Sequence, residues 1–217
     1  MKFWSDSFRD GELIPGDFAF CVIDPKTHVK LSANRNPHLA WSDLPAATRS
    51  LALICCDSDV PSRGDDVNQE GKIVPLDLPR VDFYHWVMVD IPTDISAIGA
   101  GSFADGVTPR GKAGPQIAGS PLVHGEHLRH GLNDYTGWFA ADADMSGDYF
   151  GYDGPCPPWN DALAHRYVFT LYALDIARVS VEGKFTGAEV REAIKGHVLA
   201  QASFSGGYTL NPALTKS

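Results

Sequence analysis

Four stretches of this chain carry apolar residues at spacings typical of β-strands. Ser50 to Cys56 is apolar at both alternating positions, which predicts a strand covered on both faces. Tyr84 to Ile91 and Arg166 to Leu174 are rich in β-branched and aromatic residues, and Asp17 to Val22 is a weaker strand. Strands buried on both sides predict a β-sandwich, or a central sheet covered by further layers.

One helix is predicted near the C-terminus. Thr186-Gly187-Ala188-Glu189 has the form of a capping box, in which the threonine hydroxyl and the glutamate carboxylate satisfy backbone amides. Apolar residues then recur at helical spacing from Val190 to Gln201, so we expect the helix to end before Gly206-Gly207. His197 lies on this stripe and is interpreted as a packed, hydrogen-bonded histidine rather than a ligand.

The length of 217 residues fits one large domain spanning residues 1–217, and no repeat, low-complexity tract or linker divides it. More than half of the 21 glycines lie between Gly99 and Gly154. This density disfavours long regular elements and predicts mostly loop with short turns. A loop of this length in a compact domain is usually functional or else an insertion.

The formal net charge of -9 argues against a broad nucleic-acid or anionic-membrane footprint, although one phosphate can still be bound through local donors. The start of the chain lacks the apolar segment of a signal peptide, and no run approaches membrane-spanning length. A cytoplasmic location is therefore expected, with the four cysteines as reduced thiols. Cys55 and Cys56 are expected to project to opposite faces of a strand.

Polar residues adjoin three of the apolar runs and predict a small polar pocket where the strands end. Asp57 and Asp59 follow the first run directly, and Pro61 ends it. One interpretation is a carboxylate that accepts a hydrogen bond from a histidine, fixing its tautomer and favouring its charged form. The alternative is a turn in which aspartate caps nearby amides.

Two histidines are candidates for the same pocket. His85 points into the apolar layer of its strand, where a histidine is usually a satisfied core residue. His165 precedes the last strong strand, and Tyr167 lies on the same face two residues along. Two imidazoles and a phenol supply hydrogen-bond donors suited to phosphate or carboxylate.

Gly154-Pro155-Cys156-Pro157-Pro158 is stiff enough to form a rigid apolar wall of the pocket. Cys156 and His165 are residue types that can form a nucleophile and its base, but the interpretation of Cys156 as a small packing residue is favoured. The group His124, His127 and His130 has spacings of three that can chelate a metal from a helix. A solvated loop is favoured there, because the third histidine rotates away from the first.

Together these segments resemble the phosphatidylethanolamine-binding protein family, also called Raf-kinase-inhibitor-like proteins, and most closely its bacterial branch. Asp57-Ser58-Asp59-Val60-Pro61 is similar to the family's Asp-Pro-Asp-Ala-Pro motif, with Ser58 in place of the usual proline. Tyr84-His85-Trp86 is similar to its His-Trp or His-His strand. Gly154 to Pro158, followed by His165-Arg166-Tyr167, is similar to its Gly-x-x-Pro-Pro…His-Arg-Tyr segment. The likeness covers most of the chain, in the right order.

The segment at about residues 103–152 departs from the family, because it is longer than in compact bacterial members. Within it, Asn133-Asp134-Tyr135 resembles the family's short Asn-Asp-aromatic step, and the remainder is interpreted as a loop insertion.

The resemblance implies a mainly β fold, an antiparallel β-sandwich with a few peripheral helices, including one near the C-terminus. It also implies a pocket for a small anionic ligand: phosphate, carboxylate or a phospholipid headgroup. The residues implied to bind the ligand or shape the pocket are Asp57, Asp59, Pro61, His85, Gly154, Pro158, His165 and Tyr167. We interpret His85 and His165 as donors to the anion, and Asp57 as the group that orients one of them.

Three functions follow as hypotheses, and in the third, protein contact is the activity and the pocket is a structural relic. The favoured one is a soluble binding protein that needs no metal or cofactor and modulates a protein partner, because no nucleophile–base–oxyanion set is recognised. The alternative is a hydrolase that uses Asp57 with His85 or His165 as acid–base or metal-binding groups. Neither a nucleic-acid partner nor stable membrane insertion is expected, and a homodimer is left open. The family's kinase-inhibitory role is not carried over, because no residue identifies a kinase surface.

Overall fold

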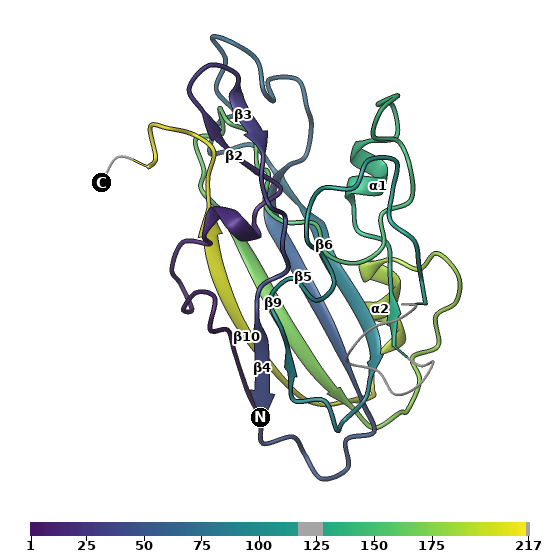
Figure 1. The fold of residues 1–217 in the computed structure, drawn as a ribbon. Coiled ribbons are helices and arrows are strands. Elements are labelled where there is room, and N and C mark those ends of the chain that lie inside the picture. Colours follow the sequence, from purple (N-terminus) through teal and green to yellow (C-terminus); the bar gives the residue numbers. More distant parts are fainter. Residues whose placement is uncertain (117–127, 216–217) are drawn as a thin grey trace.

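The computed structural model describes residues 1–116 and 128–215, and its main sheets are antiparallel (Figure 1). The largest sheet has five strands in the order β10-β9-β5-β6-β8. A three-stranded sheet, β1-β4-β7, and the hairpin β2-β3 accompany it. In chain order the elements are β1 (Lys2–Trp4), η1 (Gly16–Phe18), β2 (Cys21–Asp24), β3 (His28–Leu31), β4 (Leu39–Ser42), β5 (Ser50–Pro61), β6 (Arg80–Ile91), β7 (Ala97–Ile98), β8 (Arg129–His130), α1 (Tyr135–Trp138), β9 (His165–Leu174), α2 (Gly187–Ala193) and β10 (Val198–Tyr208).

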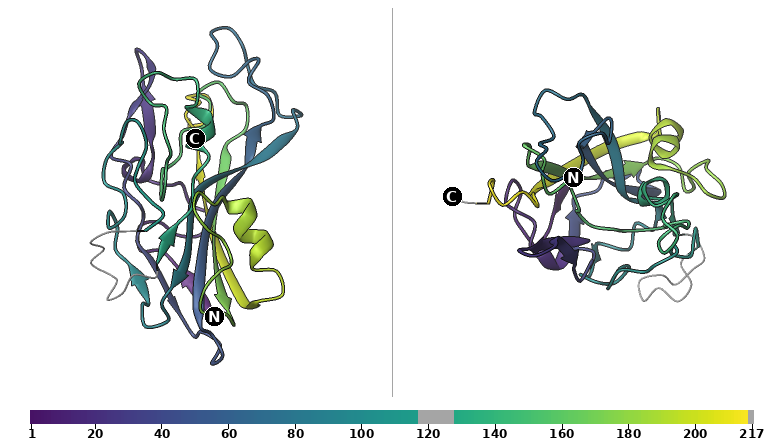
Figure 2. Two further views of the ribbon diagram at one scale, coloured as in Figure 1. Left: turned by 90° about the vertical axis from the view of Figure 1, so that its right-hand side faces the viewer. Right: turned by 90° about the horizontal axis from the view of Figure 1, so that it is seen from above.

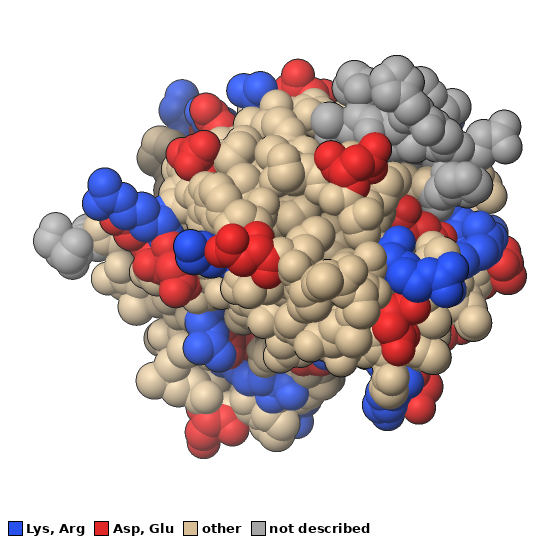
Figure 3. Space-filling view, turned by 90° about the horizontal axis from the view of Figure 1, so that it is seen from below, with Lys and Arg blue, Asp and Glu red and all other residues tan. Residues whose placement is uncertain are grey.

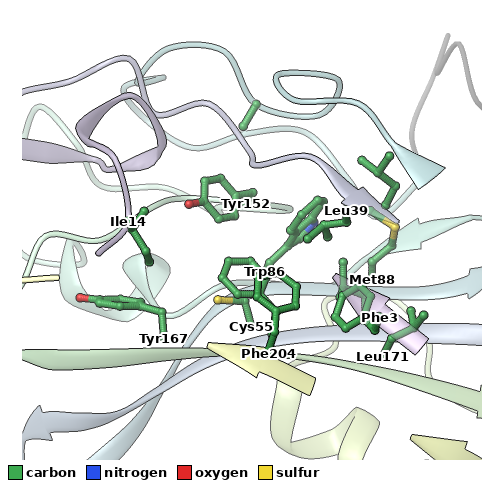
Figure 4. Packing of buried hydrophobic residues seen from close by; sticks show 14 of the residues in the cluster. Phe3, Ile14, Leu39, Cys55, Trp86, Met88, Tyr152, Tyr167, Leu171 and Phe204 are labelled. Atoms are coloured by element: carbon green, nitrogen blue, oxygen red, sulfur yellow. The ribbon is translucent and has the colours of Figure 1, made fainter. Parts of the chain in front are cut away.

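The five-stranded sheet is covered on both faces, as the apolar pattern of its central strand predicted. Cys55 of β5 packs with Trp86 and Tyr152 in the larger hydrophobic cluster (Figure 4). Cys56 belongs to the second cluster, which includes Val190 of α2. Figure 2 shows α2 on one side of the sheet and the N-terminal strands on the other. The mainly β, antiparallel architecture and the opposite orientation of the two cysteines are therefore confirmed.

The three strong strand predictions are confirmed as β5, β6 and β9, but the strand predicted from Asp17 to Val22 is wrong. A 3₁₀ turn occupies Gly16–Phe18, and β2 begins only at Cys21. Pro15 starts the turn, and its carbonyl accepts a hydrogen bond from the Phe18 N–H at 3.0 Å. The fixed φ of proline favours such a turn over a continuous extended segment.

Helix α2 begins as predicted and ends earlier. The Thr186 hydroxyl accepts a hydrogen bond from the Glu189 N–H, and the Glu189 carboxylate accepts one from the Thr186 N–H. The expected extent to Gln201 is wrong, because α2 ends at Ala193. Gly196 then has φ of +81°, a left-handed conformation that interrupts a right-handed helix. The residues beyond it pair with β9 as β10, so sheet pairing overrides the helical spacing.

His197 and the Gly206-Gly207 pair occupy places different from those expected. His197 lies in the turn before β10, where its Nδ1 is 2.9 Å from the Asp175 carboxylate. It is hydrogen-bonded as predicted, but its side chain is 43% exposed rather than packed on a helix. Gly206 and Gly207 lie inside β10, and a Cβ at Gly206 would meet the side chain of Ile14. The missing side chain lets the N-terminal segment lie against this strand.

The glycine-rich part of the chain is mostly loop in its described residues, with β8 and α1 as its helix and strand elements. The interpretation of its histidines as a solvated loop is wrong for His130, which is 5% exposed. His130 Nε2 accepts a hydrogen bond from the Trp86 indole N–H at 3.3 Å, and burial lowers the pKa of His130 to about 3. His124 and His127 lie outside the described residues.

The expectation of four reduced thiols is wrong for two of the cysteines. Cys21 and Cys156 form a disulfide, with their Cα atoms 5.1 Å apart. Cys55 and Cys56 are free and buried. The bonded pair is separated by 135 residues, so no local spacing indicated it. The disulfide forms because β2 and the proline-rich loop meet in the fold, which also replaces the interpretation of Cys156 as a simple packing residue.

The face of the molecule drawn in Figure 3 shows no large basic patch among its described residues. Basic and acidic side chains are interspersed around an uncharged centre there. Among residues 1–116 and 128–215, no helix is long and apolar enough to cross a membrane.

Candidate functional site

A pocket of about 540 Å³ is lined by residues of the β2-β3 hairpin, the connection 62–79 and the α1 region. These elements lie in the upper half of Figure 1. Most of its lining is apolar or aromatic, and charged and imidazole side chains are few. The apolar and aromatic lining residues include Phe20, Leu31, Val60, Val67, Phe83, Tyr135, Trp138, Phe139 and Met145. The pocket is thus larger and more apolar than the small polar pocket that the sequence predicts.

One polar group at the pocket is a buried cluster centred on His165. His165 Nδ1 lies 2.7 Å from Asp57 Oδ2, and its Nε2 lies 3.1 Å from Asp161 Oδ2. Arg80 donates two hydrogen bonds to the Asp161 carboxylate, at 2.6 and 3.1 Å. Each of the three residues Asp57, Asp161 and His165 is no more than 1% exposed. The cluster combines two carboxylates with two cations, which removes the cost of leaving a buried charge unpaired.

This cluster holds His165 in its charged form. Burial opposes that charge, but the hydrogen bonds to Asp161 and Asp57 raise the pKa of His165 to about 9. Burial also opposes ionisation of Asp161, yet the hydrogen bonds from His165 and Arg80 lower the pKa of that carboxyl. Both N–H groups of the imidazolium therefore donate to carboxylates. This geometry differs from the expectation that His165 itself donates to a ligand.

His85 is held in a different way. Its Nδ1 lies 2.8 Å from the Asp153 carbonyl oxygen and must donate to it, which leaves a lone pair on Nε2 of the neutral ring. Burial lowers the pKa of His85, although the Asp57 and Asp153 charges oppose the shift. The ring meets Tyr135 and Tyr167 edge-on, with centroids 5.6 and 4.9 Å away. No described residue forms a hydrogen bond with Nε2, and His85 lines the pocket.

A buried polar network fixes the segment that holds His85. Asp153 is fully buried, and its carboxylate accepts hydrogen bonds from Asn34 Nδ2 at 2.7 Å and Asn133 Nδ2 at 2.8 Å. Lys112 Nζ lies 2.7 Å from the same carboxylate, and burial lowers the pKa of Lys112. The network anchors Asp153 from three separate segments, so its carbonyl is a fixed acceptor for the imidazole.

The proline-rich loop forms one wall of the pocket. Pro157 and Pro158 line it, together with the disulfide of Cys21 and Cys156. The disulfide ties this loop to β2, and proline rings restrict its backbone. The wall is therefore constrained both covalently and conformationally.

The connection 62–79 forms another wall of the pocket and is anchored by Asn160. Asn160 Nδ2 donates to the carbonyl of Asp66 at 2.8 Å and to that of Lys72 at 3.2 Å. Its Oδ1 accepts a hydrogen bond from the Asn68 N–H at 2.9 Å. Since Asn160 lies between Pro158 and Asp161, the two walls are linked through it.

Six of the eight residues predicted for the site line the pocket, namely Asp57, Pro61, His85, Pro158, His165 and Tyr167. Asp59 lies outside the lining, and its carboxylate accepts a hydrogen bond from the Arg166 N–H at 2.9 Å. Gly154 is also outside the lining. Its carbonyl accepts a hydrogen bond from the Tyr135 hydroxyl at 2.7 Å, and a Cβ there would meet the Phe18 carbonyl oxygen. These two residues therefore contact segments around the pocket rather than lining it.

Asp161, Asp153 and Tyr135 are site residues that the sequence pattern did not single out. Asp161 precedes His165 by four residues, so a second carboxylate near a candidate histidine was the available signal. Tyr135 was visible only as the aromatic member of the Asn-Asp-aromatic step. Asp153 had no signal, because its partners come from distant segments.

The arrangement limits the chemistry that the pocket can perform. Cys156 is bonded to Cys21 and supplies no thiolate. His165 has both ring nitrogens engaged, so it has no free lone pair for a proton or a metal ion. Within the described ranges, no group of three or more His, Cys, Asp or Glu side chains is placed to hold a metal ion. His85 is left as the imidazole able to exchange a proton with a ligand.

Comparison with known proteins agrees with this fold. A sequence model described as phosphatidylethanolamine-binding protein matches residues 4–209. The UPF0098 protein YbhB of Escherichia coli K12 is 30% identical over 205 residues, which cover 94% of this chain and 98% of that protein. The putative lipoprotein LppC of Mycobacterium tuberculosis is 30% identical over 202 residues, which cover 93% of this chain and 69% of that protein. The crystal structure of E. coli YbcL is described as that of a new member of the mammalian PEBP family. It superposes with a TM-score of 0.66 at 22% sequence identity, over 96% of this chain and 97% of the YbcL chain, so the two proteins share the fold. Since the family match extends over nearly the whole sequence, this chain belongs to the phosphatidylethanolamine-binding protein family.

Proposed function

We propose that this protein binds a small molecule with an oxyanion head, carboxylate or phosphate, and an apolar remainder, without catalytic turnover. The observation that carries the proposal is the setting of His85. Its Nδ1 is committed to the Asp153 carbonyl, whereas its Nε2 has no hydrogen-bond partner among the described residues. An imidazole fixed in this way, once it is also protonated at Nε2, can direct a single N–H at one oxygen of a ligand.

The apolar remainder is inferred from the rest of the lining. Leu31 and Trp138 belong to the pocket and are 60% and 55% exposed. Exposed apolar side chains that continue a pocket are typical of a binding surface. A free phosphate would leave this surface unused, whereas a phospholipid headgroup or an alkyl phosphate would cover part of it.

A hydrolase is the second candidate and is less well supported. An acid–base mechanism needs a group with a free lone pair beside a nucleophile or an activated water. His165 is fully engaged, and the interaction partner of His85 Nδ1 is a carbonyl rather than a carboxylate. A carbonyl orients the ring but stabilises its charged form less than a carboxylate does.

Titration by NMR of protein labelled in its histidine rings tests the proposal. The probes are acetate, inorganic phosphate and hexyl phosphate, added separately. We expect saturable shifts of the His85 ring signals with each probe. Each buried methylene contributes about 0.8 kcal/mol, so hexyl phosphate should bind about tenfold or more tightly than inorganic phosphate.

His85→Ala should weaken binding of all three probes, and His197→Ala is the matched control because His197 is outside the pocket lining. Equal affinity of His85→Ala and the unchanged protein would contradict the assignment. Turnover of nitrophenyl esters or phosphates that disappears in His85→Ala would favour the hydrolase instead.

Two further expectations stay predictions. The disulfide of Cys21 and Cys156 weighs against a cytoplasmic location, because disulfides are rare in that compartment. Cell fractionation of the source organism tests the location, and light scattering of the purified protein tests whether it forms a homodimer.

A further inference from the structure

We infer that the pocket takes up its anion together with one proton, which binds His85 Nε2, so that ligand binding is coupled to proton uptake. The inference rests on the proposed function and deepens it, because it specifies the protonation state of His85 when the oxyanion head of the ligand is bound.

The first step is the tautomer of His85. Nδ1 must keep its proton to donate to the Asp153 carbonyl at 2.8 Å. A neutral ring therefore presents a lone pair at Nε2, and a lone pair repels the oxygen of a carboxylate or phosphate. His85 can donate a hydrogen bond to a carboxylate or a fully ionised phosphate only when Nε2 also carries a proton.

The second step is that the neighbouring group cannot supply this hydrogen bond. The N–H groups of His165 are directed at Asp57 and Asp161, at 2.7 and 3.1 Å. Removing the bond to Asp57 would leave that buried carboxylate without its charged partner, and removing the bond to Asp161 would leave that carboxylate with Arg80 alone. The proton must then come from solvent.

The third step concerns the charges around His85. The titratable groups that face it come from four other parts of the fold, and they are Asp57 on β5, His165 and Tyr167 on β9, Tyr135 on α1, and Asp153 in the loop before the proline-rich wall. Burial lowers the pKa of His85, which favours its neutral form at pH 7.

The last step is the charge balance of binding. An anion entering alone would add a negative charge beside Asp57, in a buried site. The anion and the proton together add no net charge, and the imidazolium formed pairs with the anion directly. The reaction is protein plus anion plus proton giving the complex, and no bond other than N–H is formed.

Hexanoate is the probe for the test, because a carboxylate of this type stays ionised above pH 6.5 and any proton taken up must go to the protein. Calorimetry in two buffers of different ionisation enthalpy, at pH 7.5, should show uptake of close to one proton per hexanoate. The Kd should rise with pH from pH 6.5 to pH 8 and approach tenfold per unit.

Two variants test which histidine takes up the proton. His85→Gln keeps an N–H donor that does not titrate, so its Kd should lose the pH dependence. His197→Gln, which changes a partly exposed histidine away from the pocket, should keep it. The calorimetric result on the unchanged protein stands even if His85→Gln does not fold.

Hexanoate binding with no proton uptake, or a pH dependence that survives in His85→Gln, overturns the inference and leaves the proposed function standing. Binding of ethylammonium that tightens as the pH rises also overturns it, because the lone pair would then be the recognition element. Failure of hexanoate and hexyl phosphate to bind at any pH would instead sink the proposed function itself.

Discussion

His165 and Asp57, which are 108 residues apart in the chain, meet in a buried ion pair with Nδ1 and Oδ2 at 2.7 Å. The pair joins the start of β9 to β5, and Asp161 engages the other side of the same ring. The histidine that a sequence motif marks for ligand binding is thus saturated by the protein. Both residues of the pair line the pocket, and in the proposed function His85 is the histidine that contacts the ligand.

Replacing His165 should cost much of the stability of the fold. His165→Ala leaves Asp57 with an unpaired buried carboxylate, a change that costs about 3–5 kcal/mol in the free energy of unfolding. Urea unfolding monitored by tryptophan fluorescence measures the loss. His197→Ala should change this free energy by less than about 1 kcal/mol, because its pair with Asp175 is partly exposed. A loss for His165→Ala as small as that of the control would contradict the ion pair.

The free energy of unfolding should fall as the pH rises from neutral to alkaline. The folded protein raises the pKa of His165 from 6.5 to about 9, so the stabilisation is fully present below pH 6.5 and is lost as the pH passes 9. The shift corresponds to roughly 3 kcal/mol. Urea unfolding at pH 6, 7.5 and 9 measures it, and His165→Asn should show a flatter profile over the same interval. A profile identical to that of the unchanged protein would mean that another group titrates.

Thiol alkylation of the unfolded protein should modify two cysteines without reductant and four with it, as measured by mass spectrometry. The protected pair is Cys21 and Cys156, and Cys55 and Cys56 are the internal control. A disulfide that closes 135 residues constrains the unfolded chain, and replacing both cysteines by serine should cost about 2–5 kcal/mol. Four modified cysteines without reductant would show that the bond does not form in the isolated protein.

Gly154→Ala should disturb the pocket, whereas Gly137→Ala should not. A Cβ at Gly154 meets the backbone carbonyl of Phe18, which cannot move away as a side chain would, and overpacking of this kind costs about 1–3 kcal/mol. A Cβ at Gly137, in α1, meets nothing within 4 Å. Thermal unfolding and hexyl phosphate affinity, measured on both variants, check the difference. Equal melting temperatures for the two variants would contradict the close approach at Gly154.

Trp138→Ala should weaken hexyl phosphate binding several-fold while leaving inorganic phosphate binding unchanged. Trp138 lines the pocket but is 55% exposed, so we expect it to contribute apolar contact with the ligand rather than support of the fold. Trp4→Ala removes an indole that is 41% exposed and outside the pocket lining, and it should affect neither ligand. A parallel loss of both ligands in Trp138→Ala would point to a general disturbance of the pocket.

Much of the fold followed from local patterns. The apolar positions of β5, β6 and β9 predicted the central strands, because alternating side chains of a strand face opposite layers. The capping box at Thr186 marked the start of α2. Its end was not visible, since the spacing after Val190 suited both a helix and the edge strand that β9 pairs with.

The candidate site was predicted in part. Asp57, His85, His165 and Tyr167 adjoin or lie within the apolar runs of three strands, and the fold gathers them at one pocket. The expectation that the pocket lies where the strands end is wrong for Asp57 and His85, which lie inside β5 and β6. Their individual roles were not predictable. Whether an imidazole donates, accepts or is saturated depends on Asp153 and Asp161, which are brought to it by loops without a periodic pattern.

By itself, the sequence determined the central sheet, the two-sided burial of its strands and the family of the chain, because these depend on side-chain order along each strand. Only the tertiary structure decided the disulfide of Cys21 and Cys156, the saturation of His165 and the open nitrogen of His85. Each of these is a contact between distant segments, and its chemistry depends on distance and burial, which no local pattern contains.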